Sequence, residues 1–220
     1  MSQIFHPATN TISRISIAAM GILLASGGFL LAALLRSPYA TQADVVRHQP
    51  IPFSHKHHVD QIGLDCRYCH TTVEDSAFAG MPATETCMGC HEHIWKDSPM
   101  LAPVRNSYAN DEPIHWTRVH DLPDFVYFDH SIHVDKGVGC STCHGRVDQM
   151  PFAWRASTLH MDWCLECHRH PEVHVRDSDE VFTMPWPPKE GLSPRDGEDL
   201  VEEYGLEPAG KLTDCSICHR

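Results

Sequence analysis

The chain has 220 residues, of which 21% are charged and 42% hydrophobic, proportions that are ordinary for a folded protein of one or two domains. Its formal net charge of −12 argues against a nucleic acid as partner, because nucleic-acid binding needs a basic surface. Ten cysteines and 18 histidines are the exceptional counts, and they indicate metal, cofactor or disulfide chemistry.

Residues 15–35 form the first predicted element, an uncharged apolar segment with an arginine on either side. A helix of that length spans the hydrocarbon core of a bilayer. The alternative is a cleaved signal peptide, but its apolar region is usually shorter, and Pro38 lies where the nearest cleavage site would need a small residue. We therefore predict a retained transmembrane helix in the lipid bilayer, with residues 1–14 before it and a linker at 36–52 after it.

All ten cysteines lie in five copies of the pattern Cys-x-x-Cys-His, which is the attachment motif of c-type haem. Positions i, i+3 and i+4 share one face of a helical turn, so both thiols can form thioethers with one porphyrin while the histidine reaches its iron. Zinc sites do not require a histidine after each cysteine pair. The motifs, numbered 1 to 5 along the chain, are Cys66-Cys69-His70, Cys87-Cys90-His91, Cys140-Cys143-His144, Cys164-Cys167-His168 and Cys215-Cys218-His219.

We therefore predict five covalently bound haems c, each with the motif histidine as the proximal iron ligand. The proximal ligands would be His70, His91, His144, His168 and His219.

An internal repeat surrounds these motifs. The first cysteines of successive motifs are 21, 53, 24 and 51 residues apart, and the pattern Phe-x-His-x-x-His-Val-Asp precedes both motif 1 and motif 3. This alternation predicts a duplication with a period of about 75 residues. The predicted parts are a two-haem repeat at 53–110, a connector at 111–127, a second two-haem repeat at 128–175, and an acidic, proline-rich arm with the fifth haem at 176–220.

The His-x-x-His pairs supply candidates for the distal iron ligands, namely His55, His58, His130 and His133. Surface positions are the alternative for all four. The arrangement resembles the class III multihaem cytochromes, which implies that the first histidine of each pair caps the haem just downstream and the second caps another haem. For the fifth haem we expect His120, with Met161 as the competitor; a core methionine is the other interpretation of Met161.

No sustained strand alternation occurs, so we expect a mainly α fold with much irregular structure. Short helices should form at the motifs and the histidine pairs, and residues 176–213, rich in Pro and Gly, should form a loop rather than a helix. Five covalent haems would supply the apolar interior. Because c-type cytochromes are matured outside the bacterial cytoplasmic membrane, the chain after residue 35 should be periplasmic and its N-terminus cytoplasmic.

Two stretches carry a more specific resemblance. Residues 114–134 read IHWTRVHDLPDFVYFDHSIHV and lead to GVGCSTCHG at 137–145, and LHMDWC at 159–164 opens motif 4. Together they resemble the pentahaem cytochrome subunit of alternative complex III. That family also has one N-terminal membrane helix and five haem motifs, so the resemblance covers nearly the whole chain; His160-Met161-Asp162 departs from the Thr-Met-Gly expected there.

The resemblance implies a subunit of a quinol-oxidising respiratory or photosynthetic complex. Its neighbours would be an iron–sulfur, molybdopterin-oxidoreductase-like subunit, a multi-span quinol-binding membrane subunit and a mono-haem cytochrome c. This chain would be no enzyme by itself. It would pass electrons through five haems to a soluble electron acceptor such as a cytochrome c or a copper protein, or to an oxidase.

Two other functions compete with this one. The first is a self-contained, membrane-anchored multihaem quinol dehydrogenase, which places its first haem near the membrane; here 30 residues separate Leu35 from Cys66. The second is a multihaem reductase, which needs an iron with an open position, and the abundance of histidine argues against it.

Overall fold

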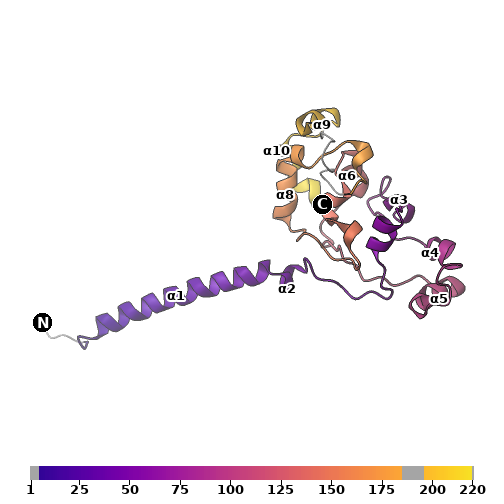
Figure 1. Cartoon of the computed structure of the whole chain (residues 1–220). Coiled ribbons are helices and arrows are strands. Elements are labelled where there is room, and N and C mark those ends of the chain that lie inside the picture. Colours follow the sequence, from indigo (N-terminus) through magenta and orange to yellow (C-terminus); the bar gives the residue numbers. More distant parts are fainter. Residues whose placement is uncertain (1–4, 185–195, 220) are drawn as a thin grey trace. The chain divides into compact units, whose positions relative to one another are not determined.

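The computed structural model describes residues 5–184 and 196–219. The chain divides into two compact units, Met1–Ala43 and Asp44–Arg220. The N-terminal unit consists of α1 (Thr9–Arg36) and the single-turn α2 (Pro38–Thr41) (Figure 1). The predicted N-terminal apolar helix is confirmed, although it begins at Thr9 rather than at residue 15.

In the described part of the chain, α1 is the one helix long and apolar enough to cross a membrane, with a mean hydropathy of 2.2 in its most apolar window. Its 28 residues extend over about 42 Å, which exceeds the roughly 30 Å of a hydrocarbon core. No residue of α1 is buried. The helix ends at Arg36 because Ser37 precedes a proline and is held extended, with φ −72° and ψ 158°.

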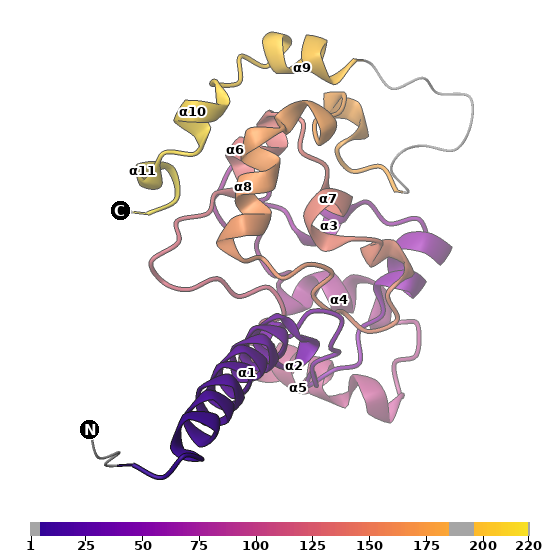
Figure 2. The same cartoon turned by 90° about the vertical axis from the view of Figure 1, so that its left-hand side faces the viewer.

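The C-terminal unit is built from short helices and long irregular connections, and its described residues contain no β-strand (Figures 1 and 2). Two isolated β-bridges, Val46–Trp154 and Val138–Val175, join distant segments. The α-helices are α3 (Cys66–Cys69), α4 (Thr84–His91), α5 (Ala102–Asn110), α6 (His130–Asp135), α7 (Cys140–His144), α8 (Met161–Arg169), α9 (Gly197–Glu203), α10 (Ala209–Leu212) and α11 (Cys215–Cys218). The others are a π-helix, η1 (Lys56–Gln61), and four 3₁₀ turns, η2 (Pro99–Leu101), η3 (Val147–Gln149), η4 (Pro171–Val173) and η5 (Ser178–Glu180). The predicted fold class is therefore confirmed.

Helices α9 and α10 correct one expectation, because residues 176–213 were predicted to be a loop. Asp196 caps α9 by accepting a hydrogen bond from the backbone N–H of Glu198 at 3.0 Å. Acidic residues in the first turn, Glu198 and Asp199, also suit the positive end of the helix dipole. The prolines of this stretch lie before α9 or, in the case of Pro208, between α9 and α10, so none interrupts a helix. The part of the stretch at 185–195 lies outside the described residues.

The side chains of the C-terminal unit form a small apolar core. Its cluster of buried residues joins Ile51, Leu101 and Val104 and packs against Trp116 and its neighbours. Most motif cysteines are half-buried rather than buried, and only Cys90 and Cys215 are exposed. A unit of this length usually encloses a larger apolar interior than these side chains supply.

Candidate haem-binding site

The five motifs adopt two local structures. Motifs 1, 3 and 5 form the single-turn helices α3, α7 and α11, which begin at the first cysteine. Motifs 2 and 4 occupy the second half of α4 and α8, which begin three residues before the first cysteine. In motifs 1 and 5 the turn closes through a bond from the histidine N–H to the carbonyl of the first cysteine, 2.9 Å in each. Both thiols and the imidazole of a motif therefore lie on one side of a helical turn.

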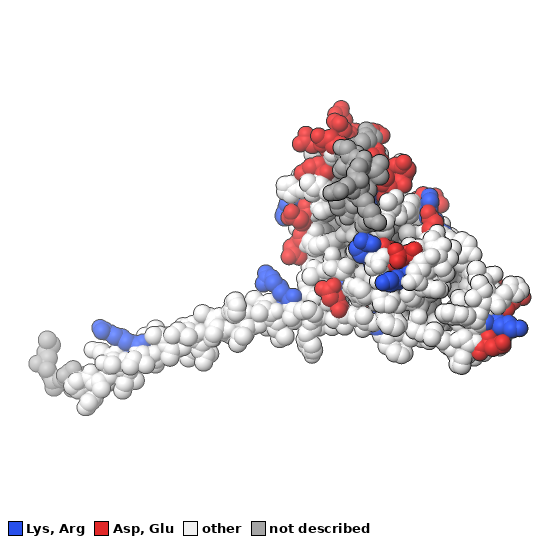
Figure 3. All heavy atoms as spheres, viewed as in Figure 1, with Lys and Arg blue, Asp and Glu red and all other residues white. Residues whose placement is uncertain are grey.

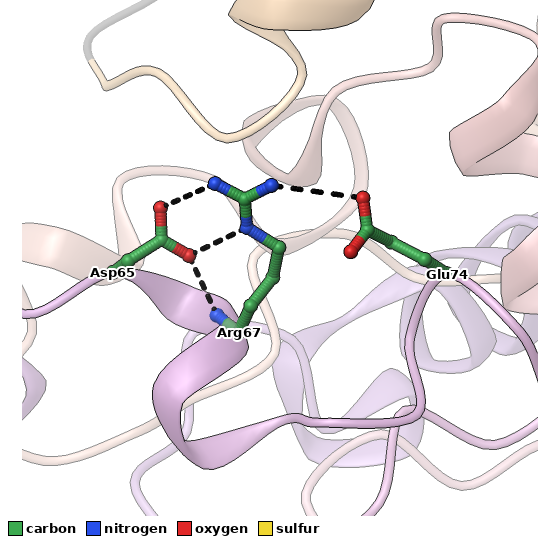
Figure 4. Close-up of polar contacts among 3 residues, drawn as sticks. All are labelled: Asp65, Arg67 and Glu74. Atoms are coloured by element: carbon green, nitrogen blue, oxygen red, sulfur yellow. Dashed lines mark hydrogen bonds and ion pairs between the residues drawn. The ribbon is translucent and has the colours of Figure 1, made fainter.

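A charged cap holds the start of motif 1. Asp65 accepts hydrogen bonds from the backbone N–H of Arg67 at 2.8 Å and from the Arg67 guanidinium at 2.9 Å through each oxygen (Figure 4). The other side of the guanidinium lies 3.7 Å from Glu74, and its face covers the ring of Phe182 at 4.4 Å. These hydrogen bonds from Arg67 lower the pKa of the Asp65 carboxyl, which stays charged and keeps capping α3.

The two His-x-x-His pairs have the same environment in both copies of the repeat. The Phe53 ring stacks on His58 at 4.4 Å and meets His55 edge-on at 5.0 Å. In the second copy, the Phe128 ring stacks on His133 at 4.5 Å and meets His130 edge-on at 4.8 Å. The second histidine of each pair also donates from Nδ1 to the carbonyl four residues earlier, 2.8 Å in the first copy and 2.6 Å in the second.

In most of the candidate iron ligands, the same ring nitrogen, Nδ1, is hydrogen-bonded to a backbone carbonyl. A carbonyl can only accept, so each of these Nδ1 atoms carries the proton, and the lone pair is left on Nε2. Metal-bound histidines are oriented in this way in proteins. The pairs are His58–Ser54 (2.8 Å), His70–Gly80 (2.8 Å), His91–Ile94 (3.1 Å), His130–Ala77 (2.8 Å), His133–Asp129 (2.6 Å), His168–Leu212 (2.8 Å) and His219–Phe125 (2.9 Å).

Three distal candidates each lie beside a motif histidine, and the three ring separations are nearly the same. A metal–imidazole bond is about 2.0 Å long and the ring centre lies about 1.1 Å behind the nitrogen, so two rings on opposite sides of one metal ion have centres about 6.2 Å apart. The observed separations are 6.2 Å for His58–His91, 6.4 Å for His130–His144 and 6.2 Å for His133–His168. Each gap has the width that one iron between two axial ligands needs.

The fourth candidate, His55, lies in a buried group of imidazoles between motifs 1 and 3. Burial and the nearby rings of His70, His58 and His120 lower the pKa of His55 to about 4. Burial, with His120 and His130 as the nearest neighbours, lowers the pKa of His144 to about 3. These imidazoles are therefore neutral at neutral pH, as metal ligation requires.

The candidates for the fifth haem lie in different places. The His120 ring is centred 4.3 Å from His144, closer than two axial ligands of one iron, and its Nε2 is buried without a hydrogen-bond partner among the described residues. Met161 opens α8 with its side chain 66% exposed. His219 packs against Phe125, with ring centres 5.8 Å apart. The structure thus places His120 next to motif 3, and the fifth distal ligand stays a prediction.

A buried arginine supports motif 3. Arg176 is 1% exposed, and its Nη2 donates to the hydroxyls of Ser141 at 3.0 Å and Thr142 at 3.1 Å. A Cβ on Gly139 would lie 1.9 Å from the guanidinium carbon, so only glycine fits there. A cavity of about 290 Å³ beside Arg176 is lined from both α7 and α8, with Arg146 as a second cation. The Arg146 guanidinium is bound by both carboxylate oxygens of Asp148, at 2.8 and 2.6 Å, and Glu166 also lines the cavity, so its lining contains both signs of charge.

These features fit a covalently bound haem: thiol pairs on helical turns, imidazoles fixed through Nδ1, and ring gaps of one iron's width. No functional role was predicted for Phe53 and Phe128, although both residues open the repeated pattern and could have been noticed there. One feature of the sequence could have indicated Arg176: the two glycines of Gly137-Val-Gly139 just before motif 3. Arg176 packs against the backbone at both glycines.

Comparisons with known proteins agree with this site. The profile of the family described as "Cytochrome c7 and related cytochrome c" matches residues 51–103, which contain motifs 1 and 2. The multihaem cytochrome c subunit of menaquinone reductase from Nitratidesulfovibrio vulgaris is 31% identical over 174 residues, which cover 79% of this chain and 68% of that protein.

Proposed function

We propose a function from one premise: this chain belongs to the family of cytochrome c7 and related multihaem cytochromes c, with covalently bound haem c as its cofactor. It is an electron-transfer subunit related to the cytochrome subunit of a menaquinone reductase. Our proposal is that it carries electrons through five haems between a quinone-reactive membrane partner and a periplasmic electron acceptor.

In this proposal each motif holds one haem through its two cysteines and ligates the iron through its histidine. The distal ligands are His58 for motif 2, His130 for motif 3 and His133 for motif 4, supported by the 6.2 to 6.4 Å ring gaps. His55 is assigned to motif 1, supported by its position beside His70. The candidates for motif 5 remain His120 and Met161, although His120 lies beside His144 of motif 3.

Bound haem c supplies reversible one-electron chemistry at iron. The chain's own residues determine what that chemistry can be used for. With two protein ligands on each iron, no coordination position would stay open, which favours electron transfer over bond-making at the metal. The carbonyls that fix Nδ1 and the stacked rings of Phe53 and Phe128 keep the imidazoles from rotating, so ligation needs little rearrangement when the charge changes.

A membrane partner is part of the proposal because one helix cannot enclose a quinone. α1 would anchor the chain in the cytoplasmic membrane, with the C-terminal unit on the periplasmic side. The resemblance to the pentahaem subunit of alternative complex III supports a multi-span quinol-binding subunit, an iron–sulfur subunit of the molybdopterin-oxidoreductase type and a mono-haem cytochrome c as neighbours.

The surface charge supports a cationic electron acceptor. Acidic side chains gather over the part of the C-terminal unit that carries α9 (Figure 3), and the whole chain has a formal net charge of −12. An acidic face attracts a positively charged partner and repels anionic ones.

The direction of electron flow separates two candidate functions. The resemblance to alternative complex III favours quinol oxidation with the electrons leaving to the periplasm. The relative is a menaquinone reductase, whose name describes electron flow into menaquinone, and this favours the reverse direction. The observed ring separations are compatible with both directions of electron flow, because a haem with two axial ligands can accept or donate an electron.

The test is a native gel of mildly solubilised membranes, stained for haem, with mass spectrometry of the band and assays in both directions. The proposal predicts a multi-subunit band that exchanges electrons between a quinol and cytochrome c. Activity with quinol as donor supports oxidation, and activity with menaquinone as acceptor supports the reverse. A small band that contains this chain alone and oxidises quinol would instead identify a self-contained dehydrogenase.

A further inference from the structure

The motifs do not follow one another in space as they do along the chain. Motif 1 and motif 2 are joined through η1 and the residue before it, His55. His55 lies near His70 of motif 1, and the ring of His58, in η1, is centred 6.2 Å from that of His91 in motif 2. A Cβ on Gly89 of motif 2 would lie 4.0 Å from the hydroxyl of Tyr68 in motif 1. One short helix therefore serves both motifs, and they are direct neighbours.

Motif 1 also touches motif 3, which comes third along the chain. The thiols of Cys66 and Cys140, the first cysteines of the two motifs, lie against each other. His130, the distal candidate for motif 3, donates from Nδ1 to the carbonyl of Ala77 at 2.8 Å, in the turn that follows motif 1. The adjacent N–H of Ser131 donates to the carbonyl of Ser76 at 3.2 Å. Three contacts therefore join motif 1 to motif 3.

The second copy of the repeat makes the third connection. α6 carries His130, which faces His144 of motif 3, and His133, which faces His168 of motif 4 across 6.2 Å. Cys143 of motif 3 neighbours both cysteines of motif 4. Motifs 3 and 4 are therefore neighbours in the same way as motifs 1 and 2.

Motif 5 joins the structure beside motif 4. His168 donates from Nδ1 to the carbonyl of Leu212 at 2.8 Å, so α8 packs along α10, as Figures 1 and 2 show from two sides. Cys164 of motif 4 and Cys218 of motif 5 are neighbours. These contacts make the fourth connection.

Motifs 1, 3 and 4 each take part in two of the four connections, whereas motifs 2 and 5 each take part in one. We infer that the five haems form one unbranched line in the order 2–1–3–4–5, with motifs 2 and 5 as its ends. One consequence of this order rests on the proposed electron-transfer function: electrons enter the line at one end motif and leave it at the other. Electron transfer slows steeply with distance, so every electron has to pass all four steps of this line in turn, and motif 3 lies at its middle.

The order is tested by deleting one haem at a time from the full-length protein. The variants are Cys87→Ser with Cys90→Ser for motif 2, Cys215→Ser with Cys218→Ser for motif 5, and Cys66→Ser with Cys69→Ser for motif 1. The remaining haems are counted by mass and titrated by electron paramagnetic resonance at poised potentials. Neighbouring charges interact most strongly, so each deletion should shift the reduction potentials of the haems next to it.

Loss of motif 2 or motif 5 should produce one large shift among the four remaining haems, and loss of motif 1 should produce two. Two large shifts after loss of either end motif would overturn the order. For a variant that fails to keep four haems, the iron positions in a cryo-electron microscopy map of the unmodified complex decide, and a direct contact of motif 2 with motif 4 or 5 would overturn it. Neither measurement uses quinol turnover. The haem order can therefore be wrong while the proposed function is right, and the proposed function can be wrong while the haem order is right.

Discussion

The ring centres of His133 and His168 lie 6.2 Å apart, with an angle of 30° between the ring planes, although the two residues belong to different helices, α6 and α8. The Nδ1 atom of each ring donates to a backbone carbonyl, at 2.6 Å to Asp129 and at 2.8 Å to Leu212. Both Nε2 lone pairs are therefore available for a metal in the gap. The first prediction follows from this pair.

His133→Ala should leave one haem without a distal ligand. We expect a high-spin signal from one iron in the electron paramagnetic resonance spectrum, because the position opposite His168 would be empty or taken by a weak ligand. All five haems should remain attached by mass, since no cysteine is changed.

The matched control is His93→Ala, an exposed histidine close to motif 2. It should leave the spectrum entirely low-spin. An unchanged low-spin spectrum in the His133→Ala variant would show that this residue is not an iron ligand.

Phe128→Leu should destabilise the second repeat. The Phe128 ring contacts both His133 and His130, and aromatic pairs of this kind contribute about 0.5–1.5 kcal/mol beyond their buried area. For a unit of this size the melting temperature should fall by a few degrees, measured through the Soret band during heating. Phe152→Leu, at a side chain that is 47% exposed, is the control and should melt like the unmodified protein. Equal melting temperatures of both variants would rule out a role for the stack.

Gly139→Ala should disrupt the packing around motif 3, because the added methyl would lie 1.9 Å from the guanidinium carbon of Arg176. Overpacking of this kind costs about 1–3 kcal/mol. We expect a lower denaturation midpoint and a smaller yield of protein with five haems. Gly210→Ala, where no atom lies within 4 Å, should keep or raise the stability. A Gly139→Ala variant as stable as Gly210→Ala would contradict the packing argument.

Arg176→Met should lower the reduction potential of a haem at motif 3 or 4. A buried cation disfavours the more positive ferric state, so its removal favours oxidation. Two unit charges about 10 Å apart at an effective dielectric constant of about 20 interact by about 1.7 kcal/mol, so we expect a change on the order of 50–100 mV. A redox titration checks this. Arg118→Met removes a charge at an arginine side chain that is 75% exposed, and solvent screening should make its effect much smaller.

The sequence predicted those parts of the structure that are local along the chain. Each motif forms its own helical turn, and each Phe-x-His-x-x-His pattern fixes its own contacts, as the matching geometry of His58 and His133 demonstrates. The fold class followed from these patterns. The helices in 196–212 were missed because prolines and glycines outweighed the capping signal of Asp196.

The pairing of imidazoles across the fold could not be predicted from spacing. His133 meets His168 and His58 meets His91 only after α6 and η1 have packed against distant helices. The burial of Arg176 depends equally on tertiary packing, since nothing in an acidic, proline-rich stretch distinguishes this arginine from an exposed one. The same applies to His120, whose place beside His144 no local pattern indicates.

The most direct test of the central claim compares haem reduction in the intact membrane complex and in this chain alone, both with their haems bound, after rapid mixing with a menaquinol analogue. A subunit that depends on a quinone-reactive partner should be reduced rapidly within the complex and only very slowly alone, whereas dithionite should reduce both fully. Equally fast reduction of the isolated chain by the quinol would contradict the claim, because this chain would then contain its own quinol site.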